Sequence, residues 1–179
     1  MSNQVMLWSM LIIPWLTLFF MKKKEIMYYM PVAFLSMSAS ALIHDMGLRL
    51  GFWFLKETAY PFYQLEPYLF GLLPVLTIWV FKFTYRQFWV YMITNLILDI
   101  GFCYFFLNVF LPSKRILSLG IPPFDVLIIN MFHALLLYSY QIWQDNALVL
   151  RDEKSNVLPS LHPVAAKPLP KDPRDKDDE

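Results

Sequence analysis

Five long apolar stretches, separated by short polar segments, fill most of the first 144 residues. They cover residues 5–21, 31–54, 68–83, 89–111 and 124–143. A helix needs about 20 mostly apolar residues, at about 1.5 Å of rise per residue, to cross the hydrocarbon core of a bilayer. The pattern therefore predicts an all-α integral membrane bundle of five transmembrane helices in residues 1–144, in contact with the lipid bilayer.

The apolar pattern stops near Gln144, and residues 145–179 are charged and rich in proline. Such a segment buries too little apolar surface to offset the entropy lost on ordering. We predict a disordered, flexible C-terminal tail on the cytoplasmic side. The alternative is a docking peptide in an extended polyproline conformation.

The second apolar stretch is unusual because it includes three ionisable residues, His44, Asp45 and Arg49. Ionisable groups inside a membrane are costly, so they usually face a partner, the protein interior or water. We therefore expect this second helix to lie at the centre of the bundle. Asp45 and Arg49 are one turn apart, a spacing that allows an ion pair within the helix.

Small residues form a second face of the same helix. At about 100° per residue, the small residues and His44 fall within an arc of about 80°, nearly opposite Asp45 and Arg49. Small residues at four-residue spacing let another helix approach closely. We predict that this helix-packing seam consists of Ser36, Ser40, Gly47 and Gly51.

Polar residues recur in the fourth and fifth stretches, which completes a predicted polar layer. Its members are His44, Asp45, Arg49, Asn95, Asp99, Asn130 and His133. Measured from the middle of each stretch, four of them lie within about 5 Å of the bilayer centre, namely His44, Asp45, Asp99 and His133. A lone carboxylate at that depth takes up a proton or finds a partner. We expect Asp99 to be protonated, or hydrogen-bonded to His133 or His44.

The distribution of basic residues predicts the orientation of the helices, because cytoplasmic loops are enriched in lysine and arginine. With the N-terminus outside, seven of the basic residues near the helix ends lie inside and three lie outside. The inner set is Lys22, Lys23, Lys24, Lys82, Arg86, Arg151 and Lys154, and the outer set is Lys56, Lys114 and Arg115. We predict an outside N-terminus and a cytoplasmic C-terminus, with the Lys114–Arg115 pair as the opposing signal.

Composition excludes several classes of protein. With 58% apolar and 18% aromatic residues, the chain exposes too much apolar surface for a soluble domain. A net charge of +1 gives no support for nucleic-acid binding. Cys103 is the only cysteine, and metalloprotease, hydrolase-elbow, P-loop and dinucleotide motifs are absent from the sequence. We expect no catalytic residues, no metal and no cofactor.

Three local phrases have a recognisable character. They are MLWSMLIIPWLTLFFMKKKE (Met6–Glu25), PVLTIWVFKFTYRQFW (Pro74–Trp89) and LLLYSYQIWQ (Leu135–Gln144). These phrases resemble small multi-pass membrane proteins of spore-forming Gram-positive bacteria, a group with no assigned activity. The resemblance covers most of the membrane part and implies a location in a bacterial plasma membrane.

The polar layer is open to three functional interpretations. Hydrogen bonds between helices favour a small accessory or scaffolding protein, which associates with another membrane protein or with itself. The same residue types are found in proton relays, so the alternative is a proton-linked carrier or channel that uses Asp99, His133 and His44. A membrane-embedded enzyme is the third interpretation.

Overall fold

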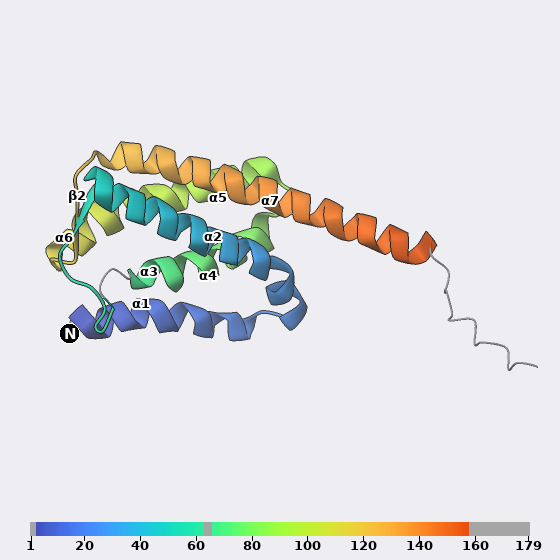
Figure 1. Ribbon diagram of the computed structural model, residues 1–179, viewed down its shortest axis with the longest axis horizontal. Coiled ribbons are helices and arrows are strands. Elements are labelled where there is room, and N and C mark those ends of the chain that lie inside the picture. The colour runs from blue at the N-terminus through green and yellow to red at the C-terminus, as the bar shows by residue number, and fades with distance from the viewer. Residues whose placement is uncertain (1–2, 63–65, 158–179) are drawn as a thin grey trace, which may run out of the picture. The chain divides into compact units, whose positions relative to one another are not determined.

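The computed structural model describes residues 3–62 and 66–157 of the chain, in which helices dominate (Figure 1). Five helical segments in these residues are long and apolar enough to cross a membrane. They are Asn3–Phe20, Lys23–Leu50, Pro67–Thr84, Phe88–Ser113 and Pro123–Leu148. The prediction of five membrane-length apolar helices is therefore confirmed. The described residues up to Ile142 form one compact unit, and those from Trp143 onward form a second.

Several of these segments consist of more than one element. In chain order the elements are α1 (Asn3–Thr17), the 3₁₀ turn η1 (Leu18–Phe20), α2 (Lys23–Leu50), β1 (Trp53–Leu55), α3 (Pro67–Phe70), α4 (Leu72–Thr84), α5 (Phe88–Ile100), the π-helical stretch η2 (Gly101–Phe110), α6 (Leu111–Ser113), β2 (Leu117–Leu119) and α7 (Pro123–Val157). The π-helix is rare and is found mostly as single turns inside α-helices, so the ten residues of η2 are an unusual departure from α-helical geometry.

Helix α2 begins earlier and ends earlier than the second apolar stretch. Its first turn contains Glu25, which suits the positive end of the helix dipole. The residues before Pro31 are mostly good helix formers, so Pro31 lies inside the helix rather than at its start. At the other end, Gly51 adopts a left-handed conformation with φ of 75° and stops the helix.

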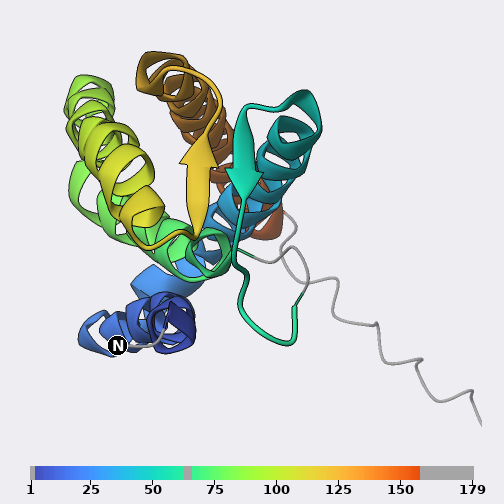
Figure 2. The same cartoon turned by 90° about the vertical axis from the view of Figure 1, so that its left-hand side faces the viewer.

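Two short strands, β1 after α2 and β2 before α7, form an antiparallel sheet that the apolar pattern did not predict. Trp53 pairs with Leu119, and Leu55 pairs with Leu117. Figure 2 shows the two strands side by side at one end of the helices. The sheet joins the loop after α2 to the loop before α7, and its pairing continues to the bond from the Lys56 N–H to the carbonyl of Ile116, at 2.7 Å.

The start of α1 is tied to the same two loops. The Asn3 side-chain amide donates to Glu57 Oε2 at 2.6 Å and to the backbone carbonyl of Lys114 at 2.9 Å. Gln4 Nε2 donates to the carbonyl of Thr58 at 2.9 Å. Both inter-helix loops at this end are therefore joined to the N-terminal helix.

Helix α4, rather than α2, lies in the middle of the first unit, which corrects our expectation of a central second helix. It contacts α1, α2 and α5, and Figure 2 shows it between α1 and the other long helices. Within its own most apolar 18-residue window, the segment Pro67–Thr84 is 56% buried, whereas the segment Lys23–Leu50 is 28% buried. The physical reason is that α4 is apolar before Lys82 except for Thr77, and helices that are apolar on nearly all sides are buried.

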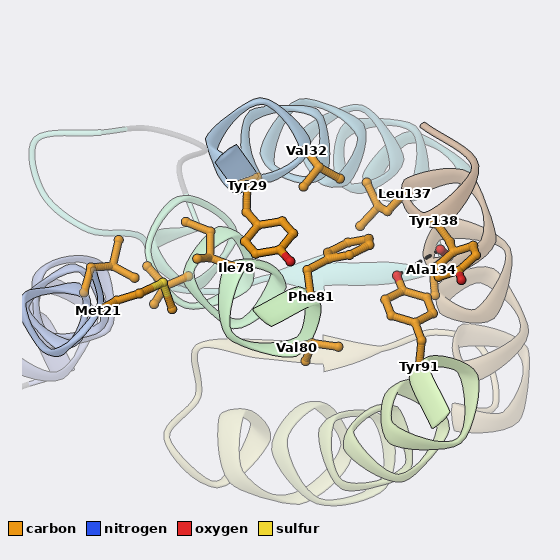
Figure 3. Packing of buried hydrophobic residues seen from close by; sticks show 13 residues of the cluster. Met21, Tyr29, Val32, Ile78, Val80, Phe81, Tyr91, Ala134, Leu137 and Tyr138 are labelled. Atoms are coloured by element: carbon orange, nitrogen blue, oxygen red, sulfur yellow. Dashed lines mark hydrogen bonds between the residues drawn. The ribbon is translucent and has the colours of Figure 1, made fainter. Parts of the chain in front are cut away.

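Aromatic rings fill the core around α4. Figure 3 shows Phe81 at the centre of this cluster, with Tyr29 on one side and Tyr91 and Tyr138 on the other. The ring centroids of Phe81 and Tyr91 are 4.9 Å apart, and those of Phe81 and Tyr29 are 6.0 Å apart. The Tyr91 hydroxyl donates to the carbonyl of Ala134 at 3.0 Å, which links α5 to α7.

Close backbone approach between α1 and the α3–α4 junction depends on Gly71. A Cβ atom at this position would collide with the carbonyl oxygen of Met10 and lie 2.6 Å from the Cα atom of Leu11. The Trp15 indole N–H donates to the carbonyl of Phe70 at 3.1 Å in the same contact. Only glycine fits between these two backbones.

Helix α7 continues past residue 144, where we expected the disordered tail to begin. Residues 145–157 are helical. They contain no proline or glycine and include the helix formers alanine, leucine, arginine, glutamate and lysine. The prolines that carried our prediction begin at Pro159, and residues 158–179 lie outside the described residues.

Candidate functional site

A cavity of about 120 Å³ lies within the first unit, between α2, α4, α5 and α7 and next to the two strands. Its polar lining comes from four helices. These residues are Ser36, Ser40 and His44 of α2, Thr77 of α4, Asn95 and Asp99 of α5, and Asn130 and His133 of α7. Aromatic and aliphatic side chains, including Trp53, Tyr68 and Phe102, form the rest of the wall.

The α2 wall is a row of polar side chains at four-residue spacing. Ser36, Ser40 and His44 are all buried, and a hydrogen bond of 3.0 Å joins the hydroxyls of Ser36 and Thr77. Four-residue spacing places these side chains on one face of the helix, over about 12 Å of its length. The polar lining therefore extends along the helix instead of forming a thin layer.

His44 is positioned by the turn that follows α2. Its ring stacks on the Trp53 indole with centroids 5.6 Å apart and planes 16° apart. The indole N–H of Trp53 donates to the carbonyl of His44 at 3.0 Å. Gly47 leaves space for this indole, because a Cβ there would collide with it. The His44 side chain is 6% exposed, and its Nε2 atom is buried without a hydrogen-bond partner.

Asp99 is bonded to a neighbouring amide rather than to a histidine. Asn130 Nδ2 donates to Asp99 Oδ1 at 3.3 Å and lies 3.6 Å from the sulfur of Cys103. A bond from Asp99 to His133 or His44, one of our two alternatives, is absent from the described residues, because Asn130 occupies the facing position on α7. The other alternative, a protonated Asp99, stays a prediction. Within residues 3–62 and 66–157, Asp99 forms no ion pair.

Two further residues of the predicted polar layer, Asn95 and His133, line the cavity and differ in their hydrogen bonds. Asn95 donates from Nδ2 to the carbonyl of Tyr91, one turn earlier in its own helix, at 2.8 Å. His133 approaches the backbone of Ser36, and its Nε2 atom is buried with no hydrogen-bond partner among the described residues. The cavity is thus bordered by two buried imidazole nitrogens with unused hydrogen-bonding capacity.

Asp45 and Arg49 do not line the cavity. Arg49 Nε lies 3.9 Å from Asp45 Oδ2, so the expected intrahelical pair is present. The Arg49 side chain is 84% exposed and the Asp45 side chain is 59% exposed. Both residues lie in the last two turns of α2. Of the predicted polar layer, the structure brings together His44, Asn95, Asp99, Asn130 and His133.

The extended start of α2 also changes the expected depths. Judged from the bounds of each helix, His44 lies about 11 Å from the middle of α2, whereas Ser36 lies close to it. Asp99 and His133 lie within about 4 Å of the middle of their own segments. These residues share one cavity at different heights.

The predicted helix-packing seam is used within the chain. Ser36 bonds to Thr77 of α4, and Ser40 borders the cavity. Gly47 contacts Trp53, and Gly51 ends the helix. The seam residues therefore have identified contacts or conformational roles inside this chain.

Sequence reasoning missed Glu66, which directly precedes α3 and lies outside the membrane-length helices. Its side chain is completely buried, and neither carboxylate oxygen has a hydrogen-bond partner in the described part of the chain. Burial raises the pKa of Glu66 from 4.5 to about 8. The sequence feature that could have indicated burial of Glu66 is its position directly before proline in the otherwise apolar and aromatic phrase EPYLF.

The arrangement suits proton exchange and hydrogen bonding with a guest. Neutral imidazole has one donor and one acceptor nitrogen, and a carboxyl group gains or loses a proton. Across residues 3–62 and 66–157, no three histidine, cysteine, aspartate or glutamate side chains are grouped so that they could hold a metal ion. Comparisons with protein-family models, curated proteins and solved structures gave no match to this chain.

Proposed function

We propose that this chain moves protons across a bacterial plasma membrane, as a channel or as a carrier that couples the proton to a solute. The observation that supports this function best is the shared cavity of Asp99, His44 and His133, which come from three different helices. Titratable groups inside a membrane bundle are expensive to bury and commonly mark substrate, ion or proton pathways. This proposal adopts the alternative interpretation of the sequence.

The geometry gives less support to an accessory or scaffolding role. That role relied on a small-residue seam free to receive another protein. Ser36 instead bonds to Thr77, and Gly47 contacts Trp53. A partner helix that used this seam would have to displace contacts within the same chain.

In the proposed path, Asp99 holds the transferable proton. A bare carboxylate in a low-dielectric interior is unfavourable, and the described residues offer Asp99 an amide but no cation. His44 and His133 each have a buried Nε2 atom available to accept a proton. The hydroxyls of Ser36 and Ser40 extend the polar lining along α2 toward the start of that helix.

The proposed orientation places the N-terminus outside and the C-terminus in the cytoplasm. Support comes from the seven basic residues on the inner side, against three on the outer side. In this orientation the β1–β2 sheet lies at the outer end and His44 lies nearer to it than Ser36 does.

Proton flux in reconstituted vesicles tests the function. Purified full-length protein is placed in liposomes containing a trapped pH-sensitive dye, with valinomycin and potassium to balance charge, and an external acid pulse starts the measurement. We expect wild-type vesicles to acidify faster than empty vesicles, and Asp99→Asn to slow the flux by at least about tenfold.

The matched control is Asp45→Asn, which removes a carboxylate that is 59% exposed and outside the cavity. This variant should retain the wild-type flux. Equal flux in wild-type and empty vesicles would overturn the proposed function. Equal flux in Asp99→Asn and the wild type would remove Asp99 from the path.

A further inference from the structure

We infer that the cavity binds a small ammonium cation with a compact apolar body. The inference builds on the proposed function by naming the chemical class of a coupled solute, and it makes its own claim about binding. Three observations support it: the charge of the cavity wall, its unpartnered polar atoms, and its size with its apolar surface.

The charge of the wall favours a cation. Among the residues that the structure describes, Asp99 is the only acidic one that lines the cavity, and no lysine or arginine lines it. The basic residue that could have neutralised this region, Arg49, points away from it and pairs with Asp45 instead. When Asp99 has released its proton, the cavity holds one carboxylate and no basic side chain, so a positively charged guest takes the place of the proton and is favoured over a neutral or negative one.

The hydrogen-bonding capacity of the wall favours a guest that donates. His44 is nine-tenths buried, lines the cavity, and has an Nε2 atom without a partner. Buried polar atoms in native proteins nearly always have a partner, so an unused one marks a place for a bound molecule or water. His133 Nε2 supplies a second such atom on the α7 side. An ammonium group has three donors and no acceptor, which complements a carboxylate and neutral imidazoles.

The volume and the remaining wall favour an organic amine over a bare metal ion. The cavity of about 120 Å³ exceeds the space needed for one water molecule and approaches that of a cavity known to hold a benzene-sized guest. The rings of Tyr68 and Phe102 pack edge to face, 5.8 Å apart, in the cavity wall. These faces suit an apolar body and attract a nearby positive charge. No metal-binding group of side chains exists among the described residues.

Cyclohexylamine is a suitable probe because two molecules with the same six-membered ring carry head groups of different charge. Cyclohexanol is neutral, and cyclohexanecarboxylate is negative. Equilibrium dialysis of labelled cyclohexylamine against the purified full chain in lipid nanodiscs, near neutral pH, measures binding without transport. Empty nanodiscs provide the correction for partition into lipid.

We expect saturable binding of cyclohexylamine, with competition by cyclohexanol weaker by at least about tenfold and none by the carboxylate. Asp99→Asn, which keeps the size of the side chain and removes its charge, should lower the affinity by at least about tenfold. Asp45→Asn should bind as the wild type does, because Asp45 is outside the cavity.

Several results would overturn the inference. These are a lack of saturable binding, equal competition by cyclohexanol, or unchanged affinity in Asp99→Asn. If Asp99→Asn does not yield folded protein, the amine and alcohol comparison on the wild type decides the question alone. Failure of the proposed function is distinguishable, because amine binding without any proton flux would overturn the function and support the inference.

Discussion

Alkaline pH should destabilise the folded chain through Glu66, and Glu66→Gln should remove this loss. Glu66 is fully buried, and its carboxylate has no hydrogen-bond partner among the described residues. Burial raises its pKa to about 8 from 4.5, so the folded chain holds a proton on Glu66 at neutral pH and the unfolded chain does not. The folded state binds more protons between these two values, and its stability therefore falls as the pH rises through that window.

The size of the effect follows from the gap between the two pKa values. At about 1.4 kcal/mol per pH unit, the interval from 4.5 to about 8 corresponds to at most about 5 kcal/mol. The loss begins above 4.5, increases through neutral pH, and levels off above about 8. Glutamine has the size of a protonated glutamate and does not ionise, so the variant retains the acidic-pH stability at every pH.

Thermal unfolding in detergent micelles, followed by tryptophan fluorescence from about pH 5 to about pH 9, measures this effect. Wild type and Glu66→Gln should unfold at similar temperatures at the acidic end, and the variant should be the more stable at the alkaline end. Asp45→Asn serves as the control, because that carboxylate is exposed and lies outside the cavity. Parallel pH profiles for the wild type and Glu66→Gln would refute the reasoning.

Two further predictions concern packing on α2. Gly47→Ala should destabilise the fold by about 1–3 kcal/mol, because a Cβ there collides with the Trp53 indole. The control is Gly101→Ala, which should not destabilise the fold, because a Cβ there meets no neighbouring atom within 4 Å. Equal unfolding midpoints of the two variants in denaturant titrations would contradict this difference. Ser36→Ala should cost about 0.6 kcal/mol by removing its bond to Thr77, and a double-mutant cycle with Thr77→Val that shows no coupling would count against this bond.

The helices were predictable from sequence because length and apolar content depend on local residues. Part of the cavity was predictable for the same reason: Asn95 and Asp99 are four residues apart, as are Ser40 and His44, so each pair shares a helix face. The residue that faces Asp99 across the interface between helices could not be predicted from local sequence. Asn130 rather than a histidine faces Asp99, and this depends on the rotation of α7 against α5.

Other features depended on contacts between distant segments. The strands β1 and β2 have three residues each, and their pairing comes from register between residues more than 60 positions apart. The central place of α4 followed from its largely apolar surface, which looked less distinctive than the charges of α2. Glu66 was overlooked because one acid in a loop looks solvated until the packing around it is known.

The β1–β2 sheet has a consequence for how the helices could separate. It connects the end of α2 to the start of α7, and Asn3 holds the start of α1 to the adjoining loops. Separation of α2 from α7 at this end would break backbone hydrogen bonds as well as side-chain contacts. If these helices move relative to one another, the sheet therefore acts as the hinge. The largest displacement then occurs at the opposite end of α2, which begins at the Lys22–Lys24 cluster.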